Sequence, residues 1–145
     1  MVTIPVLISI SSNAHRDEVA EDETMTMLTS GEMDIEDELA VIRYEETIDE
    51  SAPPQKVEVR IENECLTMSR GGVYSTQMVF RMGGRYEGMY QTPYGEMELA
   101  VYCTKLRYDL DENGGCIELS YQLDLNGKFA AMHDMQLRLV RQNDA

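Results

Sequence analysis

The sequence predicts an all-β fold: an antiparallel, up-and-down β-barrel of about eight to ten strands that is closed or nearly closed. Apolar and polar residues alternate over short runs, and no run of ordinary helical length shows amphipathic spacing. Glycine pairs and a Thr-Pro-Tyr-Gly turn divide residues 71–95 into strand-length pieces, which indicates repeated folding back within one sheet. The apolar phase changes between residues 97–101 and 106–110, which predicts a bulge near Cys103 and Thr104 where the ribbon curves toward closure.

The composition is that of a single domain over residues 1–145, long enough to bury a core without metals or disulfides. Twenty-seven acidic residues against twelve basic ones give a formal net charge of -15, which repels phosphate backbones and anionic lipids. We therefore expect no nucleic-acid or membrane partner. Three cysteines without paired spacing fit neither a disulfide framework nor a zinc site, and they favour a reducing cytoplasm.

The first apolar run, residues 2–10, predicts a strand. It has no basic leader or cleavage site and is too short to span a bilayer. Its alternation places Ile4, Val6 and Ile8 on one face, whereas Pro5 predicts that this strand lies at an edge where the barrel remains open. The acidic residues 13–23, which include His15, then predict a solvated connection.

Two further strands are expected before a break at tandem prolines. Met25 and Met27 alternate with threonines up to Gly31, and an acidic loop through Glu38 leads into a strand over residues 39–48. That third strand changes phase near Val41 and Ile42, which predicts a bulge. The prolines at positions 53 and 54 cannot donate to a ladder, so they interrupt the sheet.

Loop lengths then fix which residues share a face. A two-residue turn at Asn63 and Glu64 brings together the inward residues of two strands, which are Val57, Val59, Ile61, Leu66 and Met68. Residues 71–73 predict a three-residue turn with a glycine at positive φ, because an odd loop keeps Met78 on the face of Met68.

The last three strands predict a meander. A two-residue turn at Asn113 and Gly114 gives the pairs Leu110–Ile117, Tyr108–Leu119 and Leu106–Tyr121. A three-residue loop at residues 126–128 gives the pairs Leu125–Phe129, Leu123–Ala131, Tyr121–His133, Leu119–Met135 and Ile117–Leu137. Leu106, Tyr121 and His133 are therefore expected in one row.

Six segments resemble the YwiB-like family of domains of unknown function. They are Ile8-Ser9-Ile10, Tyr44-Glu45-Glu46 and residues 66–71, 75–80, 90–95 and 111–115, and together they extend over nearly the whole chain. The resemblance implies a small bacterial protein with a calycin-type, lipocalin-like barrel, and it implies no established enzymatic activity. The methionine content and the acidic residues 34–38 depart from the family pattern.

The candidate binding residues are those expected to line the interior: Tyr44, Glu46, Met68, Arg70, Met78, Phe80, Tyr90, Tyr121 and His133. Arg70 continues the inward series of Leu66 and Met68, so it needs a buried partner, and the carboxylate of Glu46 is the expected one. The pair is either a structural ion pair near one barrel end or the anchor for the acidic head of a ligand. In the second case the ligand tail lies along Met68, Met78 and Phe80.

Other residues point to packing more than to chemistry. Tyrosines and methionines are numerous, and the methionines at expected inward positions are Met25, Met27, Met68, Met78, Met89, Met97 and Met135; such side chains fill either a core or an adaptable pocket. The glycine pairs precede no helix, so they are turns and not phosphate loops. His133, Cys103 and Cys116 have no catalytic partners in sequence. We expect no enzyme activity, no cofactor and no metal.

Two functions of different classes follow. The first is a barrel that binds a small apolar or amphipathic molecule in its lumen. The second is an acidic interaction module, in which residues 17–23 and 34–38 dock a basic protein and the barrel is a scaffold. Closure leaves no long free edge, so a monomer or a weak dimer is expected in either case.

Overall fold

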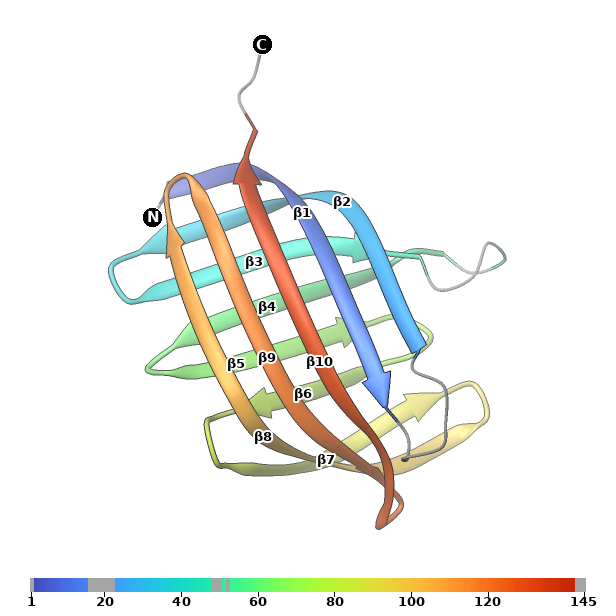
Figure 1. Ribbon diagram of the computed structural model, residues 1–145. Helices are drawn as coiled ribbons and strands as arrows, with labels where there is room; N and C mark the ends of the chain where they lie inside the picture. Colours follow the sequence, from blue (N-terminus) through green and yellow to red (C-terminus); the bar gives the residue numbers. More distant parts are fainter. Residues whose placement is uncertain (1, 16–22, 48–50, 52, 143–145) are drawn as a thin grey trace.

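The computed structural model describes residues 2–15, 23–47, 51 and 53–142, and these residues form ten antiparallel strands in a single sheet (Figure 1). In chain order the strands are β1 (Val2–His15), β2 (Glu23–Glu36), β3 (Leu39–Glu46), β4 (Gln55–Glu62), β5 (Cys65–Gly71), β6 (Thr76–Phe80), β7 (Arg85–Thr92), β8 (Gly95–Asp111), β9 (Gly114–Leu125) and β10 (Lys128–Arg141). Among the described residues, no helix capable of crossing a bilayer occurs. The predicted all-β barrel is confirmed.

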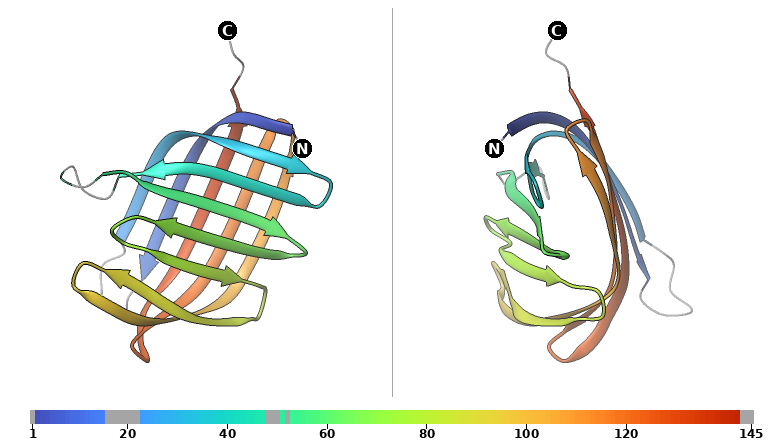
Figure 2. Two further views of the ribbon diagram at one scale, coloured as in Figure 1. Left: turned by 180° about the vertical axis from the view of Figure 1, so that it is seen from behind. Right: turned by 90° about the vertical axis from the view of Figure 1, so that its left-hand side faces the viewer.

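The sheet closes on itself almost completely. Its strand order is β6-β5-β4-β3-β2-β1-β10-β9-β8-β7, so β6 and β7 are its two edges. An isolated bridge joins Ser75 to Gln91, with backbone N–H···O distances of 3.0 and 2.9 Å. Figure 2 shows the result, a barrel with β8, β9, β10 and β1 on one side and β3 to β6 on the other. The seam of the barrel is therefore at β6 and β7.

The expectation that β1 is an open edge is wrong, because β1 pairs with β2 on one side and β10 on the other. Pro5 instead lies where the β1–β10 ladder stops. The Gln142 N–H donates to the Pro5 carbonyl at 2.9 Å, and proline has no N–H with which to return the bond.

A continuous apolar core fills the barrel. Every second residue from Ile4 to Ile10 of β1 is buried, as the alternation predicts, and Ile4, Val6 and Ile8 are completely shielded from solvent. The opposite wall contributes Ile42, Val59 and other fully buried side chains of β3 to β6. These inward residues position the ends of the strands, where the polar groups lie.

The predicted turn at Asn63 and Glu64 is confirmed. Glu62 pairs with Cys65, and the two turn residues have φ of 54° and 60°. Positive φ at both positions matches the twist of the flanking strands.

The turn between β9 and β10 contains two residues, so the predicted three-residue loop is wrong. Leu125 pairs with Lys128, and Asn126 and Gly127 take φ of 51° and 78°, the pair of positive angles that this tight turn needs. A register shift between Phe129 and Ala131 then restores the predicted pairing from Leu123–Ala131 to Ile117–Leu137. The extra residue of the bulge returns the apolar side chains of β10 to the face that they share with their partners on β9.

The turn between β8 and β9 lies at Glu112 and Asn113, one residue earlier than expected. The Asp111 carboxylate accepts the Asn113 N–H at 2.8 Å, and Gly114 takes the positive φ of 116° just after the turn. The pairs are consequently Leu110–Gly115, Tyr108–Ile117 and Leu106–Leu119. A Cβ at position 114 would lie 2.0 Å from the Leu139 carbonyl oxygen, so the strands approach too closely for any other residue.

The bulge predicted near Cys103 and Thr104 is confirmed as a register shift between Cys103 and Lys105. It places Cys103 opposite Tyr121, which pairs with His133 on its other side. The row is therefore Cys103, Tyr121 and His133, and the expected place of Leu106 in it is wrong.

Several local expectations are also corrected. The predicted three-residue turn at residues 71–73 is wrong, because five residues, 71–75, separate the paired residues Arg70 and Thr76. This number is odd, so Met68 still lies opposite Met78 as predicted. β2 continues to Glu36, so most of the acidic loop is strand, and β3 pairs regularly with no bulge at Val41.

Side-chain directions differ from expectation at a few positions. Met89 is exposed because it has the outward phase of β7. Met25 shares the phase of Met27 and Met33 but is 67% exposed, because it lies near the start of β2, beyond the part of the strand that covers the core. Asn13 and His15 belong to β1 and not to a loop, and His15 Nε2 lies 3.4 Å from a carboxylate oxygen of Asp134. The acidic residues 17–22 lie outside the described residues.

Candidate functional site

Arg70 and Glu46 form an ion pair at one end of the barrel. Arg70 follows Leu66 and Met68 on the inward face of β5, and Glu46 is the last residue of β3. The guanidinium Nε donates to Glu46 Oε1 at 2.8 Å, and the two side chains are 21% and 17% exposed. The predicted pairing is confirmed. Arg70 Nη1 and Nη2 donate to no acceptor among the residues that the structure describes.

Three tyrosines surround this pair. Burial raises the pKa of Tyr44 to about 12, with Arg70 acting in the lowering direction and Glu46 in the raising direction. Burial also raises the pKa of Tyr90 and Tyr121, and in each case Arg70 opposes the shift. The three hydroxyl groups therefore remain protonated at neutral pH and feel the field of the guanidinium.

The guanidinium stays charged in these surroundings. Burial lowers the pKa of Arg70, but Glu46, Tyr44 and Tyr121 outweigh that effect and the pKa is raised. The Arg70 guanidinium is therefore a permanent positive charge at the end of an apolar barrel.

Two polar residues that were not predicted complete the cluster. Gln55, the first residue of β4, is 3% exposed and pairs with Glu46 across the sheet. Its Oε1 accepts the Tyr74 N–H at 2.7 Å, but its Nε2 has no partner among the described residues. The same holds for the buried hydroxyl of Thr76, which stands opposite Arg70. Their inward phase with Val57 and with Met78 is the sequence signal that would have found them.

The remaining candidate residues pack the interior beside the cluster. Met68, Met78 and Phe80 are 1%, 6% and 0% exposed. The Phe80 and Tyr121 rings lie 4.7 Å apart at their centroids, and His133 stacks on Tyr121 at 5.0 Å and 11°. These side chains form a dense core next to Arg70.

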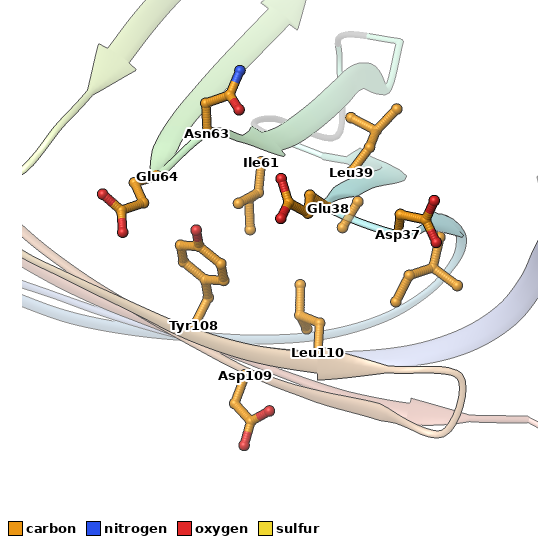
Figure 3. A pocket seen from close by; sticks show the side chains of 11 residues that line it. Asp37, Glu38, Leu39, Ile61, Asn63, Glu64, Tyr108, Asp109 and Leu110 are labelled. Carbon is orange, nitrogen blue, oxygen red and sulfur yellow. The ribbon is translucent and has the colours of Figure 1, made fainter.

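A cavity of about 670 Å³ lies at the opposite end of the barrel, which we call the mouth cavity (Figure 3). β3 begins there at Leu39 and ends at the polar cluster with Glu46, so the two sites are separated by the length of that strand. The turns after β2 and β4 and the final part of β8 surround it. Its apolar lining comes from Ile35, Leu39, Ala40, Ile61 and Leu110.

The rim of the mouth cavity is acidic. Asp37, Glu38 and Glu64 belong to the lining, and no lysine or arginine does. Figure 3 shows that Tyr108 and Leu110 rise from β8 toward Ile61 and Glu38, whereas Asp109 points to the other side of the strand. The sequence does not predict this cavity, because its lining combines residues 35–40, 61–64 and 108–110, which are far apart in the chain. The β8–β9 turn lies one residue earlier than expected, so Leu110 pairs with Gly115 and not with Ile117.

Possible metal ligands do not gather in the described part of the chain. No group of three or more His, Cys, Asp and Glu side chains there is placed to hold a metal ion. Burial raises the pKa of Cys103, so its thiol remains protonated.

Comparisons with known proteins agree with this architecture. A family model described as "Domain of unknown function (DUF1934)" matches residues 8–137. The crystal structure of the ywiB protein from Bacillus subtilis superposes with a TM-score of 0.83 at 20% identity, and the match covers 97% of this chain and 94% of that one. No curated protein matches the sequence. At this identity the structural match shows the fold alone.

Proposed function

Since this chain belongs to the DUF1934 family of domains of unknown function, its own residues must indicate its activity, and we propose that it is a non-catalytic binding protein for a small cationic amphiphile. The ligand is an organic amine with an apolar body, held in the mouth cavity. The observation that carries the proposal is the combination, in one concavity, of an apolar floor and an acidic rim without a basic residue.

The cavity has the dimensions and the chemistry of a ligand site. Small-molecule sites typically enclose about 300–1,000 Å³ and pair apolar walls with a few polar groups, and about 670 Å³ falls within that range. Ile61 and Leu110 face each other across the space and offer apolar surface. Burial of each ligand methylene between them stabilises the complex by about 0.8 kcal/mol, or roughly fourfold in affinity.

The rim determines the sign of the ligand charge. Glu38 and Glu64 stand on either side of Tyr108, so an ammonium group at this height meets two carboxylates and one aromatic ring. A carboxylate at the same place meets only like charges. The barrel therefore selects an amine over an acid with the same apolar body.

A tryptophan introduced at the mouth tests this proposal, because the chain contains no natural tryptophan. The Tyr108→Trp variant is titrated with linear alkyl amines, alcohols and carboxylates of equal chain length while its fluorescence is followed. We expect saturable binding with affinity in the order amine, alcohol, carboxylate, and tighter binding for longer amines until the cavity is full. Tyr94→Trp, at a position that is 93% exposed in the β7–β8 turn, is the matched control.

A second variant separates cavity binding from surface adsorption. Ala40→Phe places a ring in the cavity and should remove amine binding to Tyr108→Trp while the barrel remains folded by circular dichroism. Equal affinity for amines and carboxylates, or equal responses at positions 108 and 94, would contradict the proposal.

Docking of a basic protein on acidic loops is the alternative, and it has weaker support. Asp34, one of the proposed docking residues, is 6% exposed and accepts hydrogen bonds from Thr3 at 2.5 Å and Arg43 at 2.6 Å. It is therefore engaged within the sheet. Binding of a basic protein with an affinity that falls strongly as salt is added would favour this alternative.

A further inference from the structure

The polar cluster around Arg70 contains more hydrogen-bond donors than the described residues satisfy. The buried donors without a partner are Gln55 Nε2 and the Thr76 hydroxyl, and beside them Arg70 Nη1 and Nη2 of a partly exposed side chain donate to no described residue. Gln55 is 97% buried, so its amide cannot turn freely into solvent for a partner. Buried donors without acceptors cost stability, and such groups are expected to have an acceptor in the working protein.

The strand register brings these donors to one place. Thr76 is the direct partner of Arg70 across β5 and β6. Val57 is the direct partner of Arg70 on β4, and Gln55 precedes it by two residues on the same face, which makes Gln55 a diagonal neighbour of Arg70. The backbone at Gly72 lies close to the Gln55 side chain, because a Cβ at position 72 would lie 3.0 Å from Gln55 Cγ.

The charges in the cluster select the acceptor. Glu46 occupies only the Nε edge of the guanidinium, which leaves the two terminal nitrogens as a planar fork suited to a carboxylate. Glu46 already balances Arg70, and the chain carries a net charge of -15, so a single negative charge is tolerated better than a polyanion. We propose that Arg70, Gln55 and Thr76 form a second ligand site, which binds the carboxylate of a small organic monoacid.

The apolar body of this acid lies against tyrosine rings at the seam of the barrel. Tyr74 and Tyr90 are 6.4 Å apart at their centroids with their planes tilted by 59°, and Tyr90 feels the charges of both Arg70 and Glu46. The strand edges here are joined by the Ser75–Gln91 bridge alone, and the Arg70 side chain is 21% exposed, so solvent reaches the guanidinium. The barrel interior beyond Arg70 is filled by Met68 and Phe80, which directs the body of the acid outward.

The site is independent of the mouth cavity, and NMR can address it directly. The side-chain signals of Arg70 Nε–H and Gln55 Nε2–H₂ are followed while the full chain is titrated with benzoate. Benzyl alcohol is the matched neutral probe and benzylamine the cationic one. We expect saturable shifts of both signals with benzoate and none with the other two.

Two substitutions keep the local packing while they change the donors. Thr76→Val removes one hydrogen bond to a charged ligand and should weaken benzoate binding about tenfold. Gln55→Glu retains the acceptor for the Tyr74 N–H but replaces the amide donor with a negative charge, so benzoate binding should be lost. Thr26→Val, at an exposed threonine of β2, is the matched control and should bind as the natural protein does.

A third variant separates a ligand site from a structural ion pair. Arg70→Met combined with Glu46→Met removes both charges together, so the barrel should remain folded while benzoate binding disappears. Ala40→Phe at the mouth should leave benzoate binding unchanged. The proposal is overturned if benzoate produces no saturable shift at millimolar concentration, if benzyl alcohol shifts the same signals equally, or if Thr76→Val and Gln55→Glu bind benzoate normally.

Discussion

The two ends of the barrel treat polar groups in opposite ways. At the Arg70 end, charged and neutral polar side chains are enclosed: Glu46 and Arg70 bond to each other, and Gln55 is almost fully buried. At the mouth, Glu38 and Glu64 stand on turns around a cavity. The apolar core between the two ends is continuous.

This difference separates residues that hold the fold from residues that meet solvent. A substitution in the Arg70 cluster leaves a partner uncompensated in a low-dielectric site, so it changes stability. A substitution of a rim carboxylate leaves nothing unpaired, so it changes what binds and hardly alters the fold. The two ends can therefore be distinguished by comparing stability with ligand affinity.

The largest effect is expected in the core that both ends share. Leu119 of β9 is 1% exposed, so Leu119→Ala should lower the free energy of unfolding by about 2 to 5 kcal/mol. Urea unfolding measures this change, with Tyr94→Ala as the exposed control. A change below about 0.5 kcal/mol would mean that Leu119 is not a core residue.

A smaller loss is expected at the Arg70 end. Arg70→Met alone leaves the Glu46 carboxylate without its partner and should cost about 2 to 4 kcal/mol, somewhat less than for a fully buried pair because both side chains are partly exposed. Adding Glu46→Met should recover most of that loss. If the double variant is no more stable than the single one, the loss comes from packing and not from the unpaired charge.

Asp34 gives a pH-dependent effect of lower magnitude. Hydrogen bonds from Thr3 and Arg43 lower the pKa of Asp34, so its contribution is fully present above the unfolded aspartate pKa of about 3.9 and is lost as the pH falls through the folded value. Asp34→Asn should cost about 1 to 2 kcal/mol at neutral pH. The difference between the two proteins should shrink toward acidic pH in urea unfolding; a constant difference would contradict the assigned role.

The smallest effect on stability is expected at the mouth. The combined substitutions Glu38→Gln and Glu64→Gln should change the free energy of unfolding by less than about 0.5 kcal/mol. The same variant should bind alkyl amines about tenfold more weakly to Tyr108→Trp and should bind the matching alcohols unchanged. An equal loss for amines and alcohols would show that the rim acts through shape and not through charge.

Much of the fold could be predicted because alternation and turn chemistry are local signals. The inward series of β1, β4 and β5, the Asn63–Glu64 turn and the bulge at Cys103 all follow from patterns within a few residues. The lengths of the turns do not follow from the same patterns, because a bulge elsewhere in the strand can return the apolar residues to the inward face. The shift at Phe129 does so after the shorter Asn126–Gly127 turn.

The candidate site was predictable only in part. The Arg70–Glu46 pair follows from parity, since a buried guanidinium requires a carboxylate on the same side of the sheet. The unsatisfied amide of Gln55 depends on where Tyr74 lies, and the mouth cavity depends on how β8 passes the turns of the opposite wall. Such contacts between distant strands leave no local signature in the sequence. The prediction of an open edge at Pro5 is wrong for the same reason, because the pairing of β1 with β10 depends on a strand far away in the sequence.

A crystal structure with a bromine-labelled alkyl amine tests the central claim most directly, because the anomalous signal of bromine locates the ligand. We predict a bromine peak between Ile61 and Leu110, with the ammonium group near Glu38 or Glu64. A bromine peak elsewhere on the protein, or no peak in crystals whose mouth is open to solvent, would contradict the proposal that the mouth cavity is the ligand site.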